Sequence, residues 1–511
     1  MGRLLKSTMV FSAMTSISRV FGLIRDVVIA GYFGAGLEMD AFIVAFRIPN
    51  FLRRLFAEGG FSQAFVPVLS EYREQREHEE VRALVDQAAA TLGLILLGVT
   101  VVGVIAAPVL IAVFAPGFLD DPEKKQLAIS MLRITFPYIL FISLTALAGG
   151  ILNTYRQFGV PAFTPVLLNL SLIACAIWLA PHCSEPITAL AVGVFIAGVV
   201  QLLFQFPSLI RLRLFPVPRL HRDREGVRRI MTLMLPTLFA VSITQINLLV
   251  DTLIASFLQT GSISWLYYSN RMVEFPLGVF GVGLATVILP YLSADYANDA
   301  RGSYSRILTW SLRWVWLIAT PAAAGLAILA APVLITLFQY RVFTGNDAVM
   351  ASYSLMAYTA GLPAFILIKV LASAFFSRQD TRTPVKIGVI AMLSNIVLNL
   401  LLVIPLKHAG LALATSLSAY INAGLLYHHL RREGYYQPGA GWGQYVTAII
   451  AAIAAMATLL LALVPDTAAW LGWGVYERST QLLLWVAGGM ACYFAVLHLM
   501  GVRPGEMTAP T

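Results

Sequence analysis

The sequence contains little charge. Only 12% of its 511 residues are Asp, Glu, Lys or Arg, whereas soluble domains carry about 25%. Hydrophobic residues make up 59%, and apolar runs recur from one end of the chain to the other. Because a run of about 20 apolar residues spans a bilayer, this composition excludes a soluble protein. It predicts a polytopic membrane protein with little mass outside the lipid.

Cysteine is also scarce, and its spacing does not match a metal site. The three cysteines are Cys175, Cys183 and Cys492, and the first and last fall in apolar runs, where packing is the simplest role. The net charge of +9 suggests nucleic acid at first sight. The positive residues gather in short loops between apolar runs, however, so no nucleic-acid partner is expected.

The apolar runs predict an all-α integral membrane protein with about fourteen transmembrane helices. Short turn-like loops such as GAGLEMD, QTGS and FTGND separate the runs. The predicted helices cover residues 7–33, 38–68, 84–114, 126–152, 160–181, 186–210, 226–258, 263–295, 305–339, 347–376, 384–405, 408–430, 442–464 and 480–501.

Loop charges indicate the orientation. The loops on the side of the N-terminus are rich in Arg and Lys, and include EYREQREHEEVR, RLRLFPVPRLHRDREGVRR, SRQDTRTPVK and HHLRREG. The opposite side has few basic residues: Lys124, Lys125, Arg341, Lys407 and Arg478. By the positive-inside rule the rich side faces the cytoplasm, so both termini are expected there.

The two halves of the chain resemble each other. VPVLSEY at 66–72 is similar to LPYLSADY at 289–296, and FPYILFISLTALAGG at 136–150 is similar to LPAFILIKVLASAFF at 362–376. The matched landmarks keep a nearly constant offset: Asp26 with Asp251, Pro67 with Pro290, Pro137 with Pro363, and Asn169 with Asn395. Parallel repeats of this kind are typical of secondary transporters, whose site lies between the halves.

This repeat predicts four segments. Two six-helix lobes stand in tandem, a basic cytoplasmic linker joins them, and two extra helices follow. The boundaries are 1–212 for the N-terminal lobe, 213–225 for the linker, 226–433 for the C-terminal lobe, and 434–511 for the two extra helices and a cytoplasmic tail.

Several charges interrupt the apolar helices. A charge at a helix centre costs on the order of 2.5–3.5 kcal/mol on insertion scales, so it usually faces an interior or a wet cavity. A role in salt bridges or at the membrane interface is the alternative. The candidates for substrate binding are Arg19, Arg25, Arg53 and Arg271, and the cavity or gating carboxylates are Asp40, Glu58 and Glu274. Cations exceed carboxylates here, and the arginine fork suits phosphate, which predicts a phosphorylated substrate.

A membrane enzyme is the alternative from another class. Such an enzyme needs paired acidic residues near a membrane face for metal or base chemistry. The clearest pair outside the cytoplasmic loops is Asp120 and Asp121, which stand beside lysines, and the histidines show no metal spacing. We therefore expect no catalytic activity.

A cation site is a further hypothesis. Asp251 has no basic residue within a helical turn, Asn395 and Asn399 share a helix face, and Thr415 lies on the next helix. A carboxylate with amide and hydroxyl oxygens suits a hard cation such as Na⁺. Ordinary interhelical hydrogen bonds are the alternative explanation.

Three stretches resemble a known family: SRVFGLIRD, DAFIVAFRIPNFLRRLFAEGGFSQAFVPVLSEY and YYSNRMVEFPLGVFGVGLATVILP. They are similar to the MviN family of lipid II flippases, in the multidrug/oligosaccharidyl-lipid/polysaccharide (MOP) exporter superfamily. The resemblance covers essentially the whole chain. It implies a V-shaped central cavity, alternating access, and a groove for a polyprenyl tail in the last two helices. The family's cavity arginines match Arg19, Arg25, Arg53 and Arg271, and its carboxylates match Asp40 and Glu274.

The resemblance also implies the biological role. A member of this family moves undecaprenyl-pyrophosphoryl-disaccharide-pentapeptide (lipid II) from the inner to the outer leaflet of the bacterial cytoplasmic membrane, for peptidoglycan synthesis. Its partners are lipid II, membrane lipids and the cell wall synthesis machinery. Two alternatives stay open: a flippase for another polyprenyl-linked glycan, and a drug or cation exporter of the superfamily, although an exporter needs surplus carboxylates where this sequence has surplus arginine.

Overall fold

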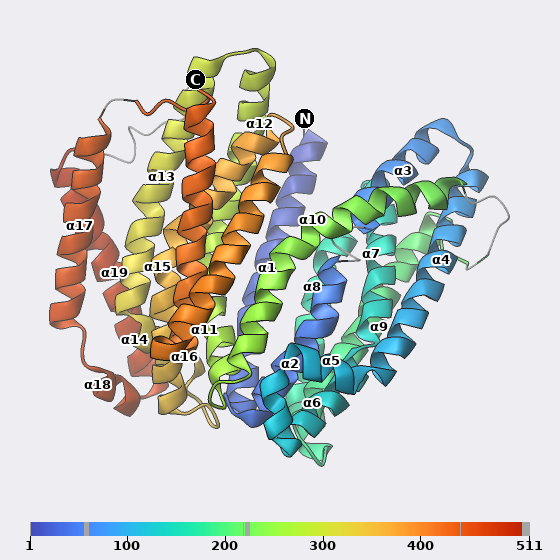
Figure 1. The fold of residues 1–511 in the computed structure, drawn as a ribbon, viewed down its shortest axis with the longest axis horizontal. Coiled ribbons are helices and arrows are strands. Elements are labelled where there is room, and N and C mark those ends of the chain that lie inside the picture. Colours follow the sequence, from blue (N-terminus) through green and yellow to red (C-terminus); the bar gives the residue numbers. More distant parts are fainter. Residues whose placement is uncertain (1, 56–60, 218, 220–224, 440, 503–511) are drawn as a thin grey trace. The chain divides into compact units, whose positions relative to one another are not determined.

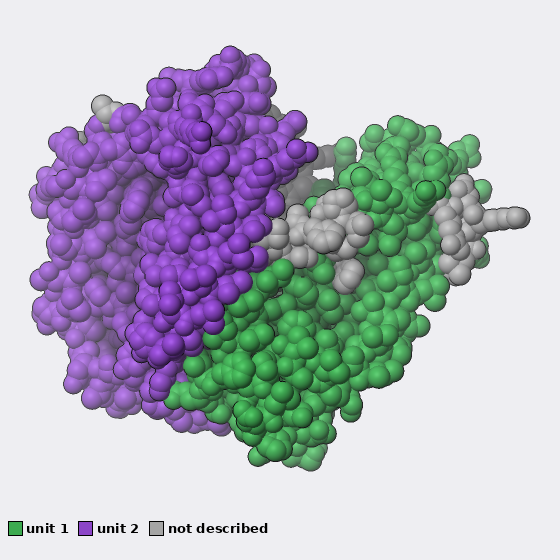
Figure 2. All heavy atoms as spheres, in the orientation of Figure 1, with its two compact units in different colours: residues 1–264 green, residues 265–511 purple. Residues whose placement is uncertain are grey.

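The structure is a computed structural model that describes all residues except 1, 56–60, 218, 220–224, 440 and 503–511. For residues 2–13, 15–16 and 235–244 it describes the backbone alone. The described residues form helices and loops, with no strand among them. They separate into two compact units, residues 1–264 and 265–511 (Figure 2).

The first unit holds the helices up to α10 (Figure 1). Within it α8 packs against α1 and α9, α7 packs against α9, and α2 packs against α6. The elements are α1 (Gly2–Phe33), α2 (Leu37–Arg53), α3 (Ser62–Gln75), α4 (His78–Ile105), α5 (Ala107–Phe114), η2 (Pro116–Asp120), α6 (Pro122–Thr135), α7 (Tyr138–Thr154), α8 (Gly159–Ala174), η3 (Cys175–Leu179), η4 (Ala180–His182), α9 (Thr188–Arg211) and α10 (Glu225–Ala255).

Proline divides two of the predicted spans. The predicted span 84–114 consists of α4 and α5, which meet at Ala106 just before Pro108, and the span 126–152 consists of α6 and α7, which meet at Pro137. Proline has no N–H to donate to the carbonyl four residues earlier, so each apolar run divides into two helices near its proline. The linker residue Val217 donates its backbone N–H to the buried carboxylate of Asp86 at 2.8 Å, which holds the chain after α9 against α4.

The second unit is built around α15. This helix packs against α13, α14 and α16, while α17 packs against α13 and α19. The elements are α11 (Ser262–Pro276, whose first three residues belong to the first unit), η5 (Leu277–Gly281), α12 (Val282–Ala297), α13 (Arg301–Ile328), α14 (Ala330–Phe338), α15 (Gly345–Phe376), α16 (Arg382–Arg432), α17 (Trp442–Leu463), α18 (Thr467–Gly472) and α19 (Val475–Leu499).

The predicted spans 384–405 and 408–430 meet at a sharp kink instead of a loop. They run together as α16, and only Lys407 departs from helical geometry, with φ 50° and ψ −128°. The two arms approach closely, because a Cβ on Gly410 would lie 2.2 Å from the carbonyl oxygen of Leu402. Glycine is therefore required at 410, and the predicted loop is absent.

All fourteen predicted ranges contain helix, and ten helices in the described part of the chain are long and apolar enough to cross a membrane. With 17 residues, α2 is too short to be counted among them. The count of fourteen spans, the lobe boundaries and the V-shaped cavity stay predictions.

The contact between α15 and α16 gives the first testable prediction. A Cβ on Gly361 would lie 2.5 Å from Ser416 Oγ and 2.7 Å from Ser416 Cα, so a larger residue must push the two helices apart. Gly361→Ala should lower the free energy of unfolding by about 1–3 kcal/mol, measured as thermal unfolding in detergent. Gly388→Ala, where nothing lies within 4 Å of the new methyl group, is the matched control and should be neutral or slightly stabilising. Equal stability of the two variants contradicts this close approach.

Candidate functional site

Asp40 is almost completely enclosed by the protein. It lies in the first turn of α2 and is 1% exposed. Its Oδ2 accepts from Lys124 Nζ at 3.0 Å and from the backbone N–H of Gly261 at 2.8 Å. Its Oδ1 accepts from the backbone N–H and the hydroxyl of Ser264 at 2.9 and 2.7 Å. Four donors therefore satisfy one carboxylate.

This carboxylate caps the start of α11. The first N–H groups of a helix have no partner within it, and a negative charge there is favourable. The residue before α11 is Gly261, which has positive φ and no capping side chain. Asp40 supplies the cap from α2 and Lys124 neutralises the charge from α6, so three segments are held at one point.

Arg25 is also buried and ion-paired. Its Nη2 lies 2.6 Å from Asp26 Oδ1, and its Nε lies 2.9 Å from the same oxygen. Its Nη1 donates to Asn169 Oδ1 of α8 at 3.0 Å, and Asn169 Nδ2 donates to the carbonyl of Ser18 at 3.2 Å. This network fastens α1 to α8 within the first unit.

The other arginines around the end of α2 have neutral oxygen partners. Arg53 Nε donates to Asn50 Oδ1 at 2.9 Å, and Arg54 Nη1 donates to Gln245 Oε1 of α10 at 3.2 Å. Neutral partners orient a guanidinium without cancelling its charge. Arg47 likewise donates to the hydroxyl oxygen of Thr252 on α10. Of the remaining predicted site residues, Arg19 is half-buried on α1, and Glu58 lies outside the described residues.

Arg271 lies on α11 in the second unit. Its Nη1 lies 2.8 Å from Glu274 Oε2, and Asn270 Nδ2 donates to Glu274 Oε1 at 3.1 Å. The Arg271 and Glu274 side chains are 30% and 44% exposed. Exposed ion pairs are worth about 0–1 kcal/mol, so an incoming anion can displace Glu274 at small cost.

The residues of the hypothetical cation site lie on two helices, α16 and α10. Asn395 and Asn399 of α16 are buried, and Asn399 Nδ2 donates to Asn395 Oδ1 at 3.0 Å. The Thr415 hydroxyl donates to the carbonyl of Leu411 at 3.0 Å, which leaves its lone pairs available. Asp251 is half-buried on α10 in the first unit. In the described part of the chain, no group of three or more His, Cys, Asp or Glu side chains is arranged to hold a metal ion.

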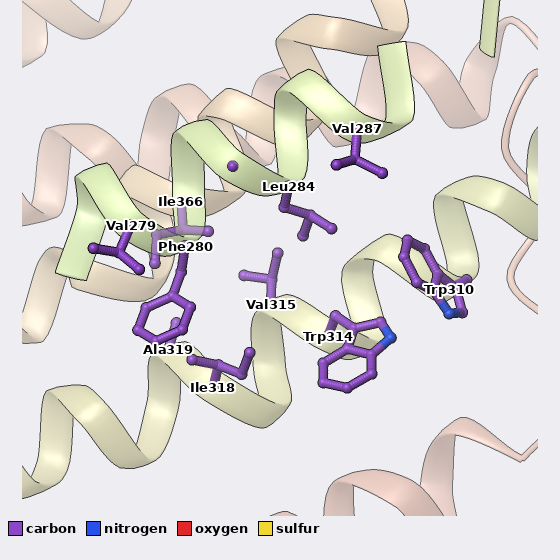
Figure 3. Close-up of a pocket in the computed structure, with 11 residues that line it drawn as sticks. Val279, Phe280, Leu284, Val287, Trp310, Trp314, Val315, Ile318, Ala319 and Ile366 are labelled. Carbon is purple, nitrogen blue, oxygen red and sulfur yellow. The ribbon is translucent and has the colours of Figure 1, made fainter. Parts of the chain in front are cut away.

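The second unit contains an apolar cavity of about 350 Å³ (Figure 3). Its walls come from η5, α12, α13 and α15. The largest lining side chains are Phe280, Leu284, Trp310, Trp314, Ile318 and Ile366. None of the lining residues belongs to α17 or α19, where the tail groove is expected, although α13 packs directly against α17.

Sequence reasoning missed the partners of the charged residues. The sequence places Lys124 in a loop and Ser264 next to the start of a predicted helix, and indicates a role for neither residue. The absence of a capping side chain at Gly261 is the one signal in the sequence that indicates a distant cap.

The chain consists of long apolar helices, and arginines oriented by oxygen partners lie within them. These features define a class, the multi-pass membrane transport proteins. The sequence model of the family "Lipid II flippase MurJ" matches residues 29–475. A "Probable lipid II flippase MurJ" of Vibrio cholerae serotype O1 is 48% identical, over 100% of this chain and 98% of the relative.

Solved structures agree with this assignment. A "Lipid II flippase MurJ, inward closed conformation" superposes with a TM-score of 0.81 at 28% identity, over 96% of this chain and 98% of that one. An inward-facing multidrug resistance MATE family transporter of the MOP superfamily reaches a TM-score of 0.68 at 16% identity, over 84% and 98%, which shows a shared fold. The chain belongs to the lipid II flippase MurJ family and is a multi-pass inner-membrane protein.

The Asp40 cluster gives the second testable prediction. Asp40→Ala leaves Lys124 and three α11 donors without their acceptor, and breaking a buried ion pair costs about 3–5 kcal/mol. The midpoint of thermal unfolding in detergent should fall clearly. Because Lys124→Met removes the unpaired charge, the double variant Asp40→Ala/Lys124→Met should recover part of the loss. If the two single losses simply add, Asp40 and Lys124 are not energetically coupled.

Proposed function

We propose that this protein moves lipid II from the inner to the outer leaflet of the bacterial inner membrane by alternating access. The observation that carries the proposal is the set of arginines, among which Arg53 contacts an amide oxygen and Arg271 contacts a half-exposed carboxylate. A pyrophosphate offers the oxygens that an arginine fork binds.

The four arginines divide by the strength of their present partners. Arg271 has a half-exposed carboxylate partner, so its guanidinium group is available to phosphate at low cost, and Arg53 is oriented by the amide oxygen of Asn50. Arg25 is paired in a buried network, where removing either partner is expensive. We assign direct phosphate binding to Arg53, Arg271 and Arg19, and an orienting role to Arg25. Glu274 competes with the substrate for Arg271, and this competition favours release.

The apolar cavity supports a lipid-linked substrate. A polyprenyl tail carries no hydrogen-bonding groups, so the surface that receives it should be apolar. The cavity beside α12 and α13 offers such a surface, with apolar side chains from four elements.

Transport without chemical change is part of the proposal. Phosphate binding by arginines requires no covalent step. The basic loops support a topology with both termini in the cytoplasm. Association with the cell wall synthesis machinery would place the flipped substrate near the enzymes that polymerise it.

The internal repeat supports sodium as a coupling ion. In the first lobe, the landmarks Asp26 and Asn169 both bind the guanidinium of Arg25. Their counterparts in the repeat are Asp251 and Asn395, and the position that corresponds to Arg25 is Val250. In the second lobe a carboxylate and an amide therefore recur without an arginine beside them in the sequence, and we propose that Na⁺ binds them together with Asn399 and Thr415. Bound sodium would also couple the cycle to membrane potential, about 2.3 kcal/mol per charge per 100 mV.

The arginines give the third prediction. In proteoliposomes, the unmodified protein should move lipid II between leaflets and leave it chemically unchanged. Arg53→Ala and Arg271→Ala should each reduce the rate at least about tenfold, because a charge-assisted hydrogen bond to phosphate is worth about 1.5–3 kcal/mol. Arg53→Lys should recover little, since lysine lacks the fork.

The control for the arginine variants is Arg306→Ala, an exposed arginine of α13. It should keep the unmodified rate, and all variants should keep their unfolding temperature. Full activity of both Arg53→Ala and Arg271→Ala excludes phosphate recognition by these residues. A chemically altered product would indicate an enzyme.

Sodium gives the fourth prediction. An inward sodium gradient imposed on proteoliposomes should change the flipping rate of the unmodified protein. Asp251→Asn should abolish that response, because it removes the charged ligand of the site. Choline replaces sodium as the control cation. If the flipping rate of the unmodified protein does not change with sodium, the proposed sodium site is wrong.

A further inference from the structure

Two tyrosines of the C-terminal helices donate hydrogen bonds to the backbone of α13. The hydroxyl of Tyr493 on α19 donates to the carbonyl of Leu317 at 2.9 Å, and the hydroxyl of Tyr445 on α17 donates to the carbonyl of Arg313 at 2.6 Å. The two tyrosines are 1% and 7% exposed. The two accepting carbonyls are one turn apart on α13.

The carbonyl of Leu317 is available because of Pro321. In an α-helix the carbonyl of residue 317 accepts from the N–H of residue 321, and α13 has proline there. Proline has no N–H, and its ring pushes the carbonyl four residues earlier off the helix axis. No water reaches this depth in a membrane, so the freed carbonyl needs a partner from the protein. Tyr493 is that partner.

The same turn of α13 forms a wall of the apolar cavity. Ile318 and Ala319 lie between the freed carbonyl and Pro321, and both line the cavity together with Trp314 (Figure 3). The face that carries Leu317 packs instead into a buried cluster with α17 and α19. One face of this proline turn therefore meets the C-terminal helices, and the other meets the cavity.

We propose that Tyr493, assisted by Tyr445, is a positioning residue for the tail of the substrate. The C-terminal helices brace α13 at its proline turn and thereby hold the cavity wall in the shape that receives a polyprenyl chain. The inference rests on the proposed function, because it assigns the cavity to the lipid tail. It gives the two helices that follow the repeat a specific task.

Packing alone does not explain the tyrosines. The cluster around Leu317 is otherwise made of apolar side chains, among them Ile449, Ala452, Met456 and Leu460. Phenylalanine would fill the place of Tyr493 equally well and carries no hydroxyl group that needs a partner. The hydroxyl group is useful because α13 has an unpaired carbonyl at that depth. The proline and the tyrosine are thus two parts of one arrangement, on helices that are far apart in sequence.

The test is a double-mutant cycle on the purified full-length protein. Two probes share one headgroup: lipid II with its undecaprenyl tail, and an analogue with a farnesyl tail. Tyr493→Phe should weaken binding of the long-tailed probe about tenfold and change binding of the short-tailed probe less than about twofold. In the Pro321→Ala background the backbone regains an N–H for Leu317, so adding Tyr493→Phe should cost less than about twofold.

Tyr476→Phe is the matched control, since Tyr476 lies on the same helix and is 81% exposed. It should bind both probes as the unmodified protein does. Two results would overturn the proposed positioning role of Tyr493. One is an equal loss of affinity for both probes in Tyr493→Phe, and the other is an equal loss of affinity from Tyr493→Phe with and without Pro321. If the unmodified protein shows no preference for the long tail, the assignment of the cavity to the tail fails, and the brace fails with it. The proposed transport of lipid II is judged separately, by the flipping rate.

Discussion

The absence of water inside a membrane is the constraint on which this structure depends. A buried charge or an unpaired backbone group has no solvent to bind, so each needs a partner within the protein. Asp40 has four donors, Arg25 has a carboxylate and an amide, and the carbonyl freed by Pro321 has the hydroxyl of Tyr493. Each of these contacts joins helices that hydrophobic packing alone would leave free to slide.

The same constraint sorts the charged residues by role. A charge that is fully paired and buried, such as Asp40 or Arg25, fixes the position of helices. A charge whose partner is half-exposed, such as Arg271, is available to another molecule at lower cost. The difference lies in the partners, because the side chains themselves are of the same few types. A transporter needs both kinds, since its substrate must be bound and then released.

Polar contacts of this kind also explain how the C-terminal helices belong to the second unit. Their apolar faces pack on α13, but apolar packing in a lipid environment gains little from the hydrophobic effect, because lipid tails are equally apolar. The hydroxyl groups of Tyr445 and Tyr493 give this contact a defined register along α13. Arg478, buried at the start of α19, adds a contact at the far end through the carbonyl of Leu471.

Much of the fold follows from properties that are local along the chain. Apolar run length, loop charge and the repeated landmarks predict fourteen ranges that all contain helix in the structure, and the quoted motifs indicate the family that the comparisons bear out. The short helix α18 lies outside those ranges, and the boundary predicted at 406–407 is a kink instead of a loop. Hydropathy did not predict the breaks at Ala106 and Pro137, because it is the same on both sides of each.

The partners of the charged residues were decided by tertiary structure alone. Asp40 meets Lys124 and Ser264, which are 84 and 224 residues away in sequence, and Tyr493 meets a carbonyl 176 residues away. A single sequence shows which groups cannot be left unpaired in a membrane. Which distant group satisfies each one depends on how the helices pack, since hydrogen bonds form only at about 3 Å.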